Sequence, residues 1–185
     1  MDQQPESDMT HTKLDLSLIV AMTPRGVIGH SDGNPLWHLQ SHLDLARRIS
    51  NKSVIVSDIQ TVKFLRDNQI ETWFYRVESP IVVVANEVGF EAALSAAMAY
   101  KKSIFVLGRE VSWLYKLFIP YAKVIRQTIV HDVMDGDVLF PTLHAQDWAV
   151  SENTGIPRFH HVHDSHKTTQ CVMERVPIEV QCVQD

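Results

Sequence analysis

Residues 16–29, LSLIVAMTPRGVIG, decide the fold that this chain is expected to adopt. The run LSLIVAM at 16–22 is almost wholly apolar, contains β-branched residues and has the length of a strand. Such a run is typical of a strand that is buried on both faces, as the strands of a parallel sheet are. TPRG at 23–26 then predicts a turn, because proline and glycine favour turn geometry. We therefore expect the folded part of the chain to begin with an interior strand.

The same signature recurs along the chain, with helical patterns between the repeats. Further short apolar runs predict strands at 53–57, 80–86, 103–108 and 124–131. Helices are predicted from a cap at Ser41 to Ile49, at 59–68, at 90–101 and at 110–122, which Pro120 brings towards its end. Beyond 131 only strands are predicted, at 148–153, 158–164 and 168–176. This order predicts an α/β fold: a central, mostly parallel sheet of about eight strands, with helices on both faces and an antiparallel C-terminal strand.

The composition is that of one globular domain. The 185 residues are 45% hydrophobic and 21% charged, which is ordinary for a soluble protein. A net charge of −5 gives no attraction to nucleic acid or anionic lipid, and no apolar run reaches the roughly 20 residues of a membrane span. Residues 1–13 are polar and are expected to form a mobile tail, neither a signal nor a transit peptide. Residues 14–185 then form the single domain, and the cytoplasm is its expected location.

Two sets of potential metal or redox ligands lie near the C-terminus. Cys171 and Cys182 could pair across a hairpin, but free thiols in a reducing cytosol are the expected state. His161 and His163 alternate on a predicted strand and would share a face, as metal ligands do. Exposed histidines at a sheet edge are the simpler interpretation, so no metal is expected. CxxC, P-loop, GxSxG and GxGxxG motifs are absent from the sequence.

The succession of these segments resembles the dihydrofolate reductase family. LSLIVAMTPRGVIG is similar to that family's first strand and the loop after it. Further similarities, in order, are LWHL (36–39) to its Pro-Trp-x-Leu, NKSVIVSD (51–58) to its second strand, SIFVLGRE (103–110) to its Gly-Gly strand end, LFIPYAKVI (117–125) to the following helix, MDGDVLFP (134–141) to its Glu-Gly-Asp-Thr-x-Phe-Pro turn, and DSHKTTQCVMERV (164–176) to its closing strand. The resemblance covers about residues 14–176. It implies that family's fold and its reaction, the NADPH-dependent reduction of 7,8-dihydrofolate to tetrahydrofolate.

The resemblance places a pterin site beside Trp37, and the chain departs from the pattern there. The family has a carboxylate five residues after the tryptophan, which accepts two hydrogen bonds from the pterin; this chain has His42. A neutral imidazole offers one acceptor, so one pterin donor would stay unpaired at a cost of roughly 1–3 kcal/mol. An imidazolium offers no acceptor. His42 is expected either to face the ligand, where it could donate a proton near neutral pH, or to be a structural or exposed residue.

Other pterin-side positions agree with the family pattern. Ala21 and Ile28 match substrate-binding positions, and Trp37 lies beside the site. Thr128 matches the strand position from which the family's threonine steadies the carboxylate and a water; an ordinary strand threonine is the equal alternative. The family's arginine for the substrate's glutamate has no counterpart in register, because Arg76 is two or more places away.

The dinucleotide side departs further from the pattern. The family's Gly-Arg-x-Thr, which grips phosphates, is replaced by a segment that begins with Ser57 and Asp58. Ala85 stands where an arginine for the 2′-phosphate is frequent, and Gly108-Arg109 replaces a glycine pair against which the cofactor packs. Arg109 would fill the cofactor's space or, alternatively, supply the missing phosphate charge. Ser57, Gly108 and Arg109 are the expected cofactor contacts, and weak or lost NADPH binding is expected.

These departures lie on different elements but belong to one function, while frame residues such as Pro120, Asp137 and Phe140 remain. The favoured interpretation is a binding or structural role, with a pterin- or folate-like ligand or a protein partner, and with standard catalysis impaired or lost. One alternative is a working reductase that uses His42, or a water, as its proton source and Arg109 for phosphate. Another is a reductase of a different pterin-like or nucleotide substrate.

Overall fold

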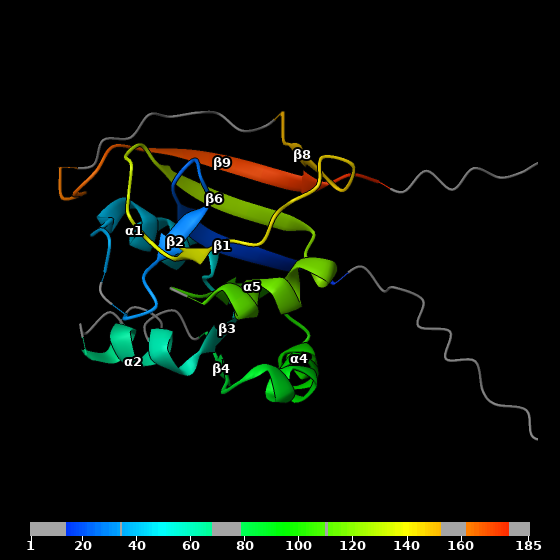
Figure 1. Ribbon diagram of the computed structural model, residues 1–185. Coiled ribbons are helices and arrows are strands. Elements are labelled where there is room, and N and C mark those ends of the chain that lie inside the picture. Colours follow the sequence, from blue (N-terminus) through cyan, green and yellow to red (C-terminus); the bar gives the residue numbers. More distant parts are fainter. Residues whose placement is uncertain (1–13, 34, 68–78, 110, 153–161, 178–185) are drawn as a thin grey trace, which may run out of the picture.

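A seven-stranded sheet forms the centre of the computed structural model (Figure 1). Its strands, in spatial order, are β4 (Ile81–Val84), β3 (Val54–Asp58), β5 (Ile104–Leu107), β1 (Leu16–Met22), β6 (Val124–Val130), β9 (Thr168–Arg175) and β8 (Trp148–Val150). The first five run parallel to their neighbours, and β9 and β8 pair antiparallel. The predicted mostly parallel sheet with an antiparallel C-terminal end is thus confirmed, with seven described strands in it.

The structure describes residues 14–33, 35–67, 79–109, 111–152 and 162–177. Several sequence predictions lie outside these ranges: the tail at 1–13, Arg76, His161 and Cys182. Within them, no helix is long and apolar enough to cross a membrane.

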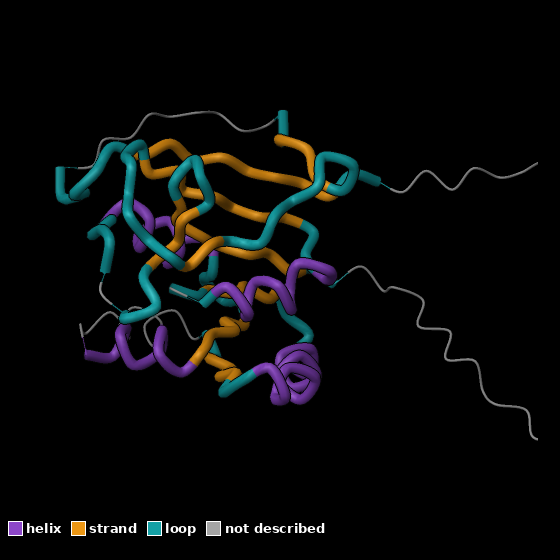
Figure 2. The backbone as a smooth tube through the Cα atoms, viewed as in Figure 1, coloured by secondary structure: helices purple, strands orange, loops and turns teal. Residues whose placement is uncertain are grey.

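Helices cover both faces of the sheet (Figure 2). The side chains of β1 alternate between the two apolar layers that lie under these helices. Leu16, Leu18 and Val20 belong to one layer and Ile19 to the other. The first layer includes side chains of α4 (Phe90–Ala99) and α5 (Ser112–Phe118), and the second includes side chains of α1 (Gln40–Ile49) and α2 (Ile59–Asp67). The continuous apolar run of β1 is therefore explained by burial on both sides, as the sequence predicted.

Some local predictions were wrong or incomplete. β2 (Val27–Gly29) and β7 (Val138–Leu139) form a separate antiparallel pair that was not predicted. Residues 162–164, the described part of the strand predicted at 158–164, are not a strand. Two short 3₁₀ helices were also missed: η1 (Glu87–Gly89) before α4 and η2 (Ile119–Tyr121), which contains Pro120 and ends α5.

The β2–β7 pair requires glycine at position 136, which gives the first prediction. A Cβ atom on Gly136 would lie 2.5 Å from Val27 Cγ1 and 2.7 Å from the Gly29 carbonyl oxygen. Gly136→Ala should therefore lower the free energy of unfolding by roughly 1–3 kcal/mol, the usual cost of overpacking. Denaturant unfolding measures it. Gly89→Ala is the matched control, because its Cβ would meet only Asn86 Oδ1, at 3.7 Å. Equal stability of Gly136→Ala and wild type would contradict the described contact.

Candidate active site

A small cavity of about 60 Å³ lies where β1 and β5 end. Its lining residues are Ala21, Ile28, Leu36, Trp37, His42, Gly108 and Arg109. Four of the five residues predicted for the pterin side, all but Thr128, and two of the three predicted for the cofactor side thus meet around one space. The carboxyl ends of parallel strands are the usual place for a ligand in an open α/β sheet.

His42 is the buried polar residue of this cavity. It lies on α1, is 9% exposed, and its Nδ1 is 2.9 Å from the hydroxyl of Thr128 on β6. Thr128 is fully buried and is the register partner of Ala21 on β1. Burial lowers the pKa of His42 from 6.5 to about 4, while the nearby Asp164 carboxylate raises it in part. The imidazole is therefore neutral at pH 7.

The bond to Thr128 limits what the ring can offer a ligand. If the Thr128 hydroxyl donates to Nδ1, then Nε2 carries the proton and is a donor. If Nδ1 carries the proton and donates to Thr128, then Nε2 is a single acceptor. In neither tautomer does His42 present two acceptors side by side, which a carboxylate does.

The helix that carries His42 is capped by a distant carboxylate. Leu39, the N-cap of α1, makes no side-chain cap bond. The Ser41 backbone N–H instead donates to Asp164 Oδ1 at 2.9 Å, and the Ser41 hydroxyl donates to Asp164 Oδ2 at 2.5 Å. The prediction that Ser41 caps this helix is therefore wrong, because Ser41 lies inside the first turn and Asp164 accepts its donors. A carboxylate is favourable at this end of a helix.

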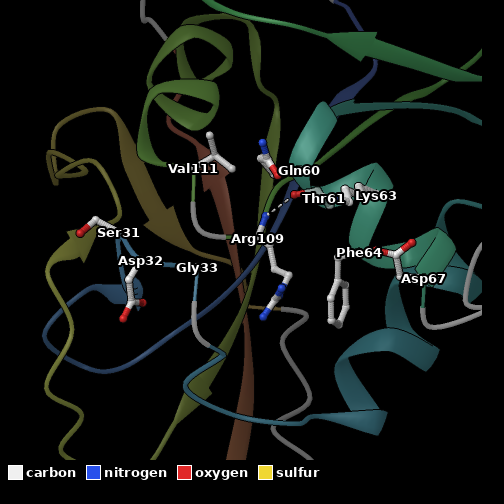
Figure 3. A pocket seen from close by; sticks show the side chains of 10 residues that line it. All are labelled: Ser31, Asp32, Gly33, Gln60, Thr61, Lys63, Phe64, Asp67, Arg109 and Val111. Carbon is white, nitrogen blue, oxygen red and sulfur yellow. Dashed lines mark hydrogen bonds between the residues drawn. The ribbon is translucent and has the colours of Figure 1, made fainter.

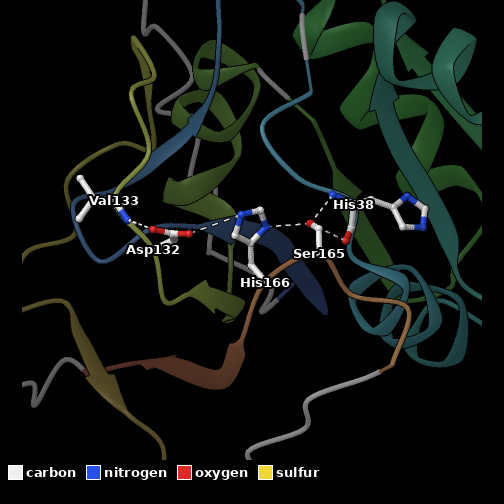
Figure 4. Close-up of polar contacts among 5 residues, drawn as sticks. All are labelled: His38, Asp132, Val133, Ser165 and His166. Atoms are coloured by element: carbon white, nitrogen blue, oxygen red, sulfur yellow. Dashed lines mark hydrogen bonds and ion pairs between the residues drawn. The ribbon is translucent and has the colours of Figure 1, made fainter.

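Ser165 and His166, which follow Asp164, form a group of polar contacts at His38, the residue after Trp37 (Figure 4). The Ser165 N–H donates to the His38 carbonyl at 2.8 Å, and the His38 N–H donates to the Ser165 hydroxyl at 2.9 Å. The Ser165 hydroxyl also lies 2.7 Å from His166 Nδ1, and His166 Nε2 lies 3.5 Å from an oxygen of Asp132. The order of carboxylate, imidazole and hydroxyl is that of a nucleophilic triad. Here, however, the Ser165 hydroxyl accepts the His38 N–H and donates to the His38 carbonyl, and Ser165 lines neither of the two cavities described. Its role is therefore structural: it joins the C-terminal segment to the chain at His38.

The histidine-rich tract therefore has a structural use in its described part. Within the described ranges, no three histidine, cysteine or acidic side chains are grouped as metal ligands would be. His163 lies in a turn, and Cys171 is a partly buried free thiol. No local sequence pattern links Asp164 to Ser41, because 123 residues separate them.

A second, larger cavity of about 510 Å³ adjoins the first at Arg109, which lines both (Figure 3). Its lining residues are Ser31, Asp32, Gly33, Gln60, Thr61, Lys63, Phe64, Asp67, Arg109 and Val111. The Arg109 guanidinium carbon lies 3.8 Å from the centroid of the Phe64 ring, a cation–π contact. Figure 3 shows the Arg109 side chain between Gly33 and Phe64. The volume falls in the range of small-molecule pockets.

The loop that borders the larger cavity is attached to the β2–β7 pair. Asp137 accepts the Ser31 backbone N–H at 2.8 Å and the Ser31 hydroxyl at 2.5 Å. These donors lower the pKa of Asp137, with a further contribution from His30, whose Nδ1 is 3.5 Å away. The ionised carboxylate thus holds residues 30–33 at the cavity wall.

Asp58, the last residue of β3, directly precedes α2, whose Gln60 and Thr61 line the larger cavity. Its Oδ1 accepts the backbone N–H groups of Gln60 and Thr61, each at 2.9 Å, and its Oδ2 accepts the Thr61 hydroxyl at 2.5 Å. Asp58 is 2% exposed. It is therefore the N-cap of α2, since a capping side chain accepts from the second and third helical residues. Ser57, before it, is fully buried, donates to the Leu107 carbonyl and lines neither cavity, so its position gives no support to the predicted cofactor contact.

Tyr115 is a buried residue that sequence reasoning missed. Its hydroxyl accepts the Gly108 N–H at 3.1 Å and lies 2.5 Å from the Gly108 carbonyl and 2.8 Å from the Ile19 carbonyl. Burial raises the pKa of this phenol. The Gly108–Arg109 peptide bond is trans, and a Cβ on Gly108 would lie 3.1 Å from Leu114. Tyr115, on α5, thus holds the end of β5 in place through its contacts with Gly108. In the sequence, the only indication of this role was a tyrosine on an otherwise apolar helix face.

The model of the dihydrofolate reductase family matches residues 15–175. The chain belongs to that family. It is 27% identical over 150 residues to a dihydrofolate reductase of Staphylococcus haemolyticus, across 77% of this chain and 87% of that one. It is 28% identical over 134 residues to a type 6 dihydrofolate reductase of Proteus mirabilis, across 69% and 82% of the two chains. A dihydrofolate reductase of Haemophilus influenzae is 25% identical over 142 residues, across 74% and 85%.

Family membership makes NADPH the cofactor to test against this site. The first turn of α2 does not fit one of its phosphates, because the Gln60 and Thr61 amides already donate to the Asp58 carboxylate. Ala85, directly after β4, is exposed and offers no charge. Arg109 is the cation that does border the larger cavity, together with Lys63.

The pKa of His42 predicts how stability depends on pH. Between pH 6.5 and about 4 the unfolded chain binds a proton on His42 that the folded protein does not bind. The free energy of unfolding should therefore fall as the pH is lowered through this window, by about 1.4 kcal/mol per pH unit. Above this window, the ionisation of His42 should have no effect on stability. His42→Gln should show a flatter dependence in urea unfolding at a series of pH values. His38→Gln, at an exposed histidine, should keep the wild-type slope. Identical slopes in wild type and His42→Gln would refute the buried neutral imidazole.

Proposed function

We propose that this dihydrofolate reductase family member binds a pterin- or folate-like molecule in the His42 cavity, and that its NADPH-dependent reduction of dihydrofolate is impaired or lost. The His42–Thr128 pair is the observation that carries the proposal. A neutral ring bound to Thr128 lies at the position where the resemblance to the family implies a carboxylate. The frame around it is kept, because Ala21, Ile28 and Trp37 still border the same space.

The hydrogen bonds that a pterin would make follow from this pair. Its 2-amino group and the neighbouring ring N–H are two adjacent donors, and His42 can accept from one of them at most. The other would remain unpaired, which weakens binding by roughly 1–3 kcal/mol. The cationic, protonated pterin that forms during reduction also loses the stabilising negative charge of a carboxylate.

Proton delivery is weakened as well. A pKa of about 4 leaves the imidazole without a second proton at neutral pH, so it is a poor source of protons for the ligand. His42 in this proposal orients the ligand through one hydrogen bond, and Thr128 fixes the ring. Trp37 supplies an apolar wall.

A working reductase with an altered site is the second candidate. It is favoured by the size of the larger cavity and by the two cations that border it, Lys63 and Arg109. In that case Arg109 would neutralise a phosphate and a water would deliver the proton. A different pterin-like substrate would fit the same arrangement.

His42→Asp separates these candidates. The change restores two adjacent acceptors, so dihydrofolate should bind more tightly by about 1–3 kcal/mol, roughly 5- to 150-fold, in isothermal titration calorimetry. NADPH-dependent turnover should remain absent or slow, because the Asp58 end of the larger cavity is unchanged. His38→Asp introduces the same charge at an exposed position and should leave dihydrofolate affinity as in wild type.

Two results would contradict the proposal. Wild-type turnover of dihydrofolate with NADPH above about 1 per second would place the protein among ordinary enzymes. Unchanged dihydrofolate affinity in His42→Asp would show that position 42 does not contact the pterin.

A further inference from the structure

The backbone N–H groups in the first turn of α2 already bind an anion from this chain, the Asp58 carboxylate. The backbone N–H groups of a helix's first turn form a ready anion-binding site, since they lack partners within the helix and lie at the positive end of its dipole. In α2 the Asp58 carboxylate accepts two of these groups, from Gln60 and Thr61, both at 2.9 Å. Gln60 and Thr61 also line the larger cavity, so the filled site faces the space that a ligand would enter.

We propose that Asp58 is a specificity-determining residue of the larger cavity, which selects against ligands that place a phosphate at the first turn of α2. This inference rests on the proposed function, and it assigns that function's loss of the dinucleotide to one side chain. The ligand class that remains compatible with this end of the cavity is uncharged there.

The Asp58 carboxylate competes with a phosphate for the backbone N–H groups of Gln60 and Thr61. One amide N–H donates fully to one acceptor, so a phosphate at the same place would find the Gln60 and Thr61 donors in use. It would also lie against a carboxylate that is 2% exposed and poorly screened by solvent. Displacing Asp58 would leave its charge buried without these donors, which opposes an exchange of one anion for the other.

The same carboxylate also fixes the position of Arg109. The Thr61 hydroxyl donates to Asp58 at 2.5 Å and accepts the Arg109 backbone N–H at 2.9 Å, the contact drawn in Figure 3. Arg109 then covers the Phe64 ring and borders both cavities. Asp58 thus closes the phosphate end and, through Thr61, places the residue that separates the two cavities.

ADP and adenosine are the probes that test the proposal. Their titration into full-length protein without magnesium would be followed by NMR through the Gln60 and Thr61 amides. Asp58→Ser keeps a capping hydroxyl but removes the charge, and it should bind ADP at least tenfold more tightly than wild type, with adenosine affinity unchanged. Asp58→Asn keeps the size of the side chain and should also gain, which preserves the test if the serine variant does not fold.

Two controls isolate the cause. Asp67→Ser removes an equal charge from the other end of α2 in the same cavity, and should change ADP affinity by less than threefold. Thr61→Val breaks the link to Arg109 but leaves Asp58 on the backbone amides, and should not gain ADP affinity. A comparable gain in ADP affinity in either control would overturn the proposal. The same holds if the Asp58 variants gain no ADP affinity, or if the wild-type protein binds ADP tenfold more tightly than adenosine.

The test is independent of the pterin cavity. Turnover by the wild-type protein would overturn the proposed function, whereas the ADP titration compares variants without dihydrofolate or reduction. Failure of the Asp58 variants to gain ADP would therefore overturn this inference alone.

Discussion

The pairing of β1 on both sides with parallel strands is the constraint on which the rest of the structure depends. A strand in this position has no face left for solvent, so its side chains alternate between two helical layers. At its carboxyl end Ala21 and the adjacent Thr128 point to the layer that contains α1, because parallel neighbours in register share a face. The place of the smaller cavity, at the carboxyl end of β1, follows from this arrangement.

Within that arrangement, α1 is held at two points that determine the chemistry of His42. Thr128 binds the imidazole from the sheet, and Asp164 binds Ser41, the preceding residue, from the C-terminal segment. Burial keeps the ring neutral, although the Asp164 carboxylate favours its charged form. The group that faces the smaller cavity from α1 is thus a neutral ring and not an anion. At α2, too, a carboxylate of the chain itself, Asp58, accepts the backbone donors of the helix end.

Sequence alone predicted the parts of the fold that depend on local pattern. Burial of β1 and the parallel order of its neighbours followed from apolar runs and their alternation with helices. The β2–β7 pair did not, because strands of three and two residues are defined by their partner and not by composition. The cap from Asp164, the burial of Ser57 and the clasp of Tyr115 on Gly108 were also missed, since each joins residues far apart in the sequence or hidden by packing. Six of the seven residues around the small cavity, all but Leu36, were named from the sequence, but their hydrogen bonds and protonation depend on the tertiary structure.

A neutral His42 bound to Thr128 is the central claim, and the titration of its ring tests it most directly. Two-dimensional NMR of the imidazole resonances between pH 3.5 and 8, assigned with His42→Gln, would give the pKa of this side chain. We predict a pKa near 4, with the ring neutral at pH 7 and its shifts unchanged through the range in which exposed histidines titrate. A pKa at or above the ordinary 6.5 would contradict the buried pair and with it the proposed function.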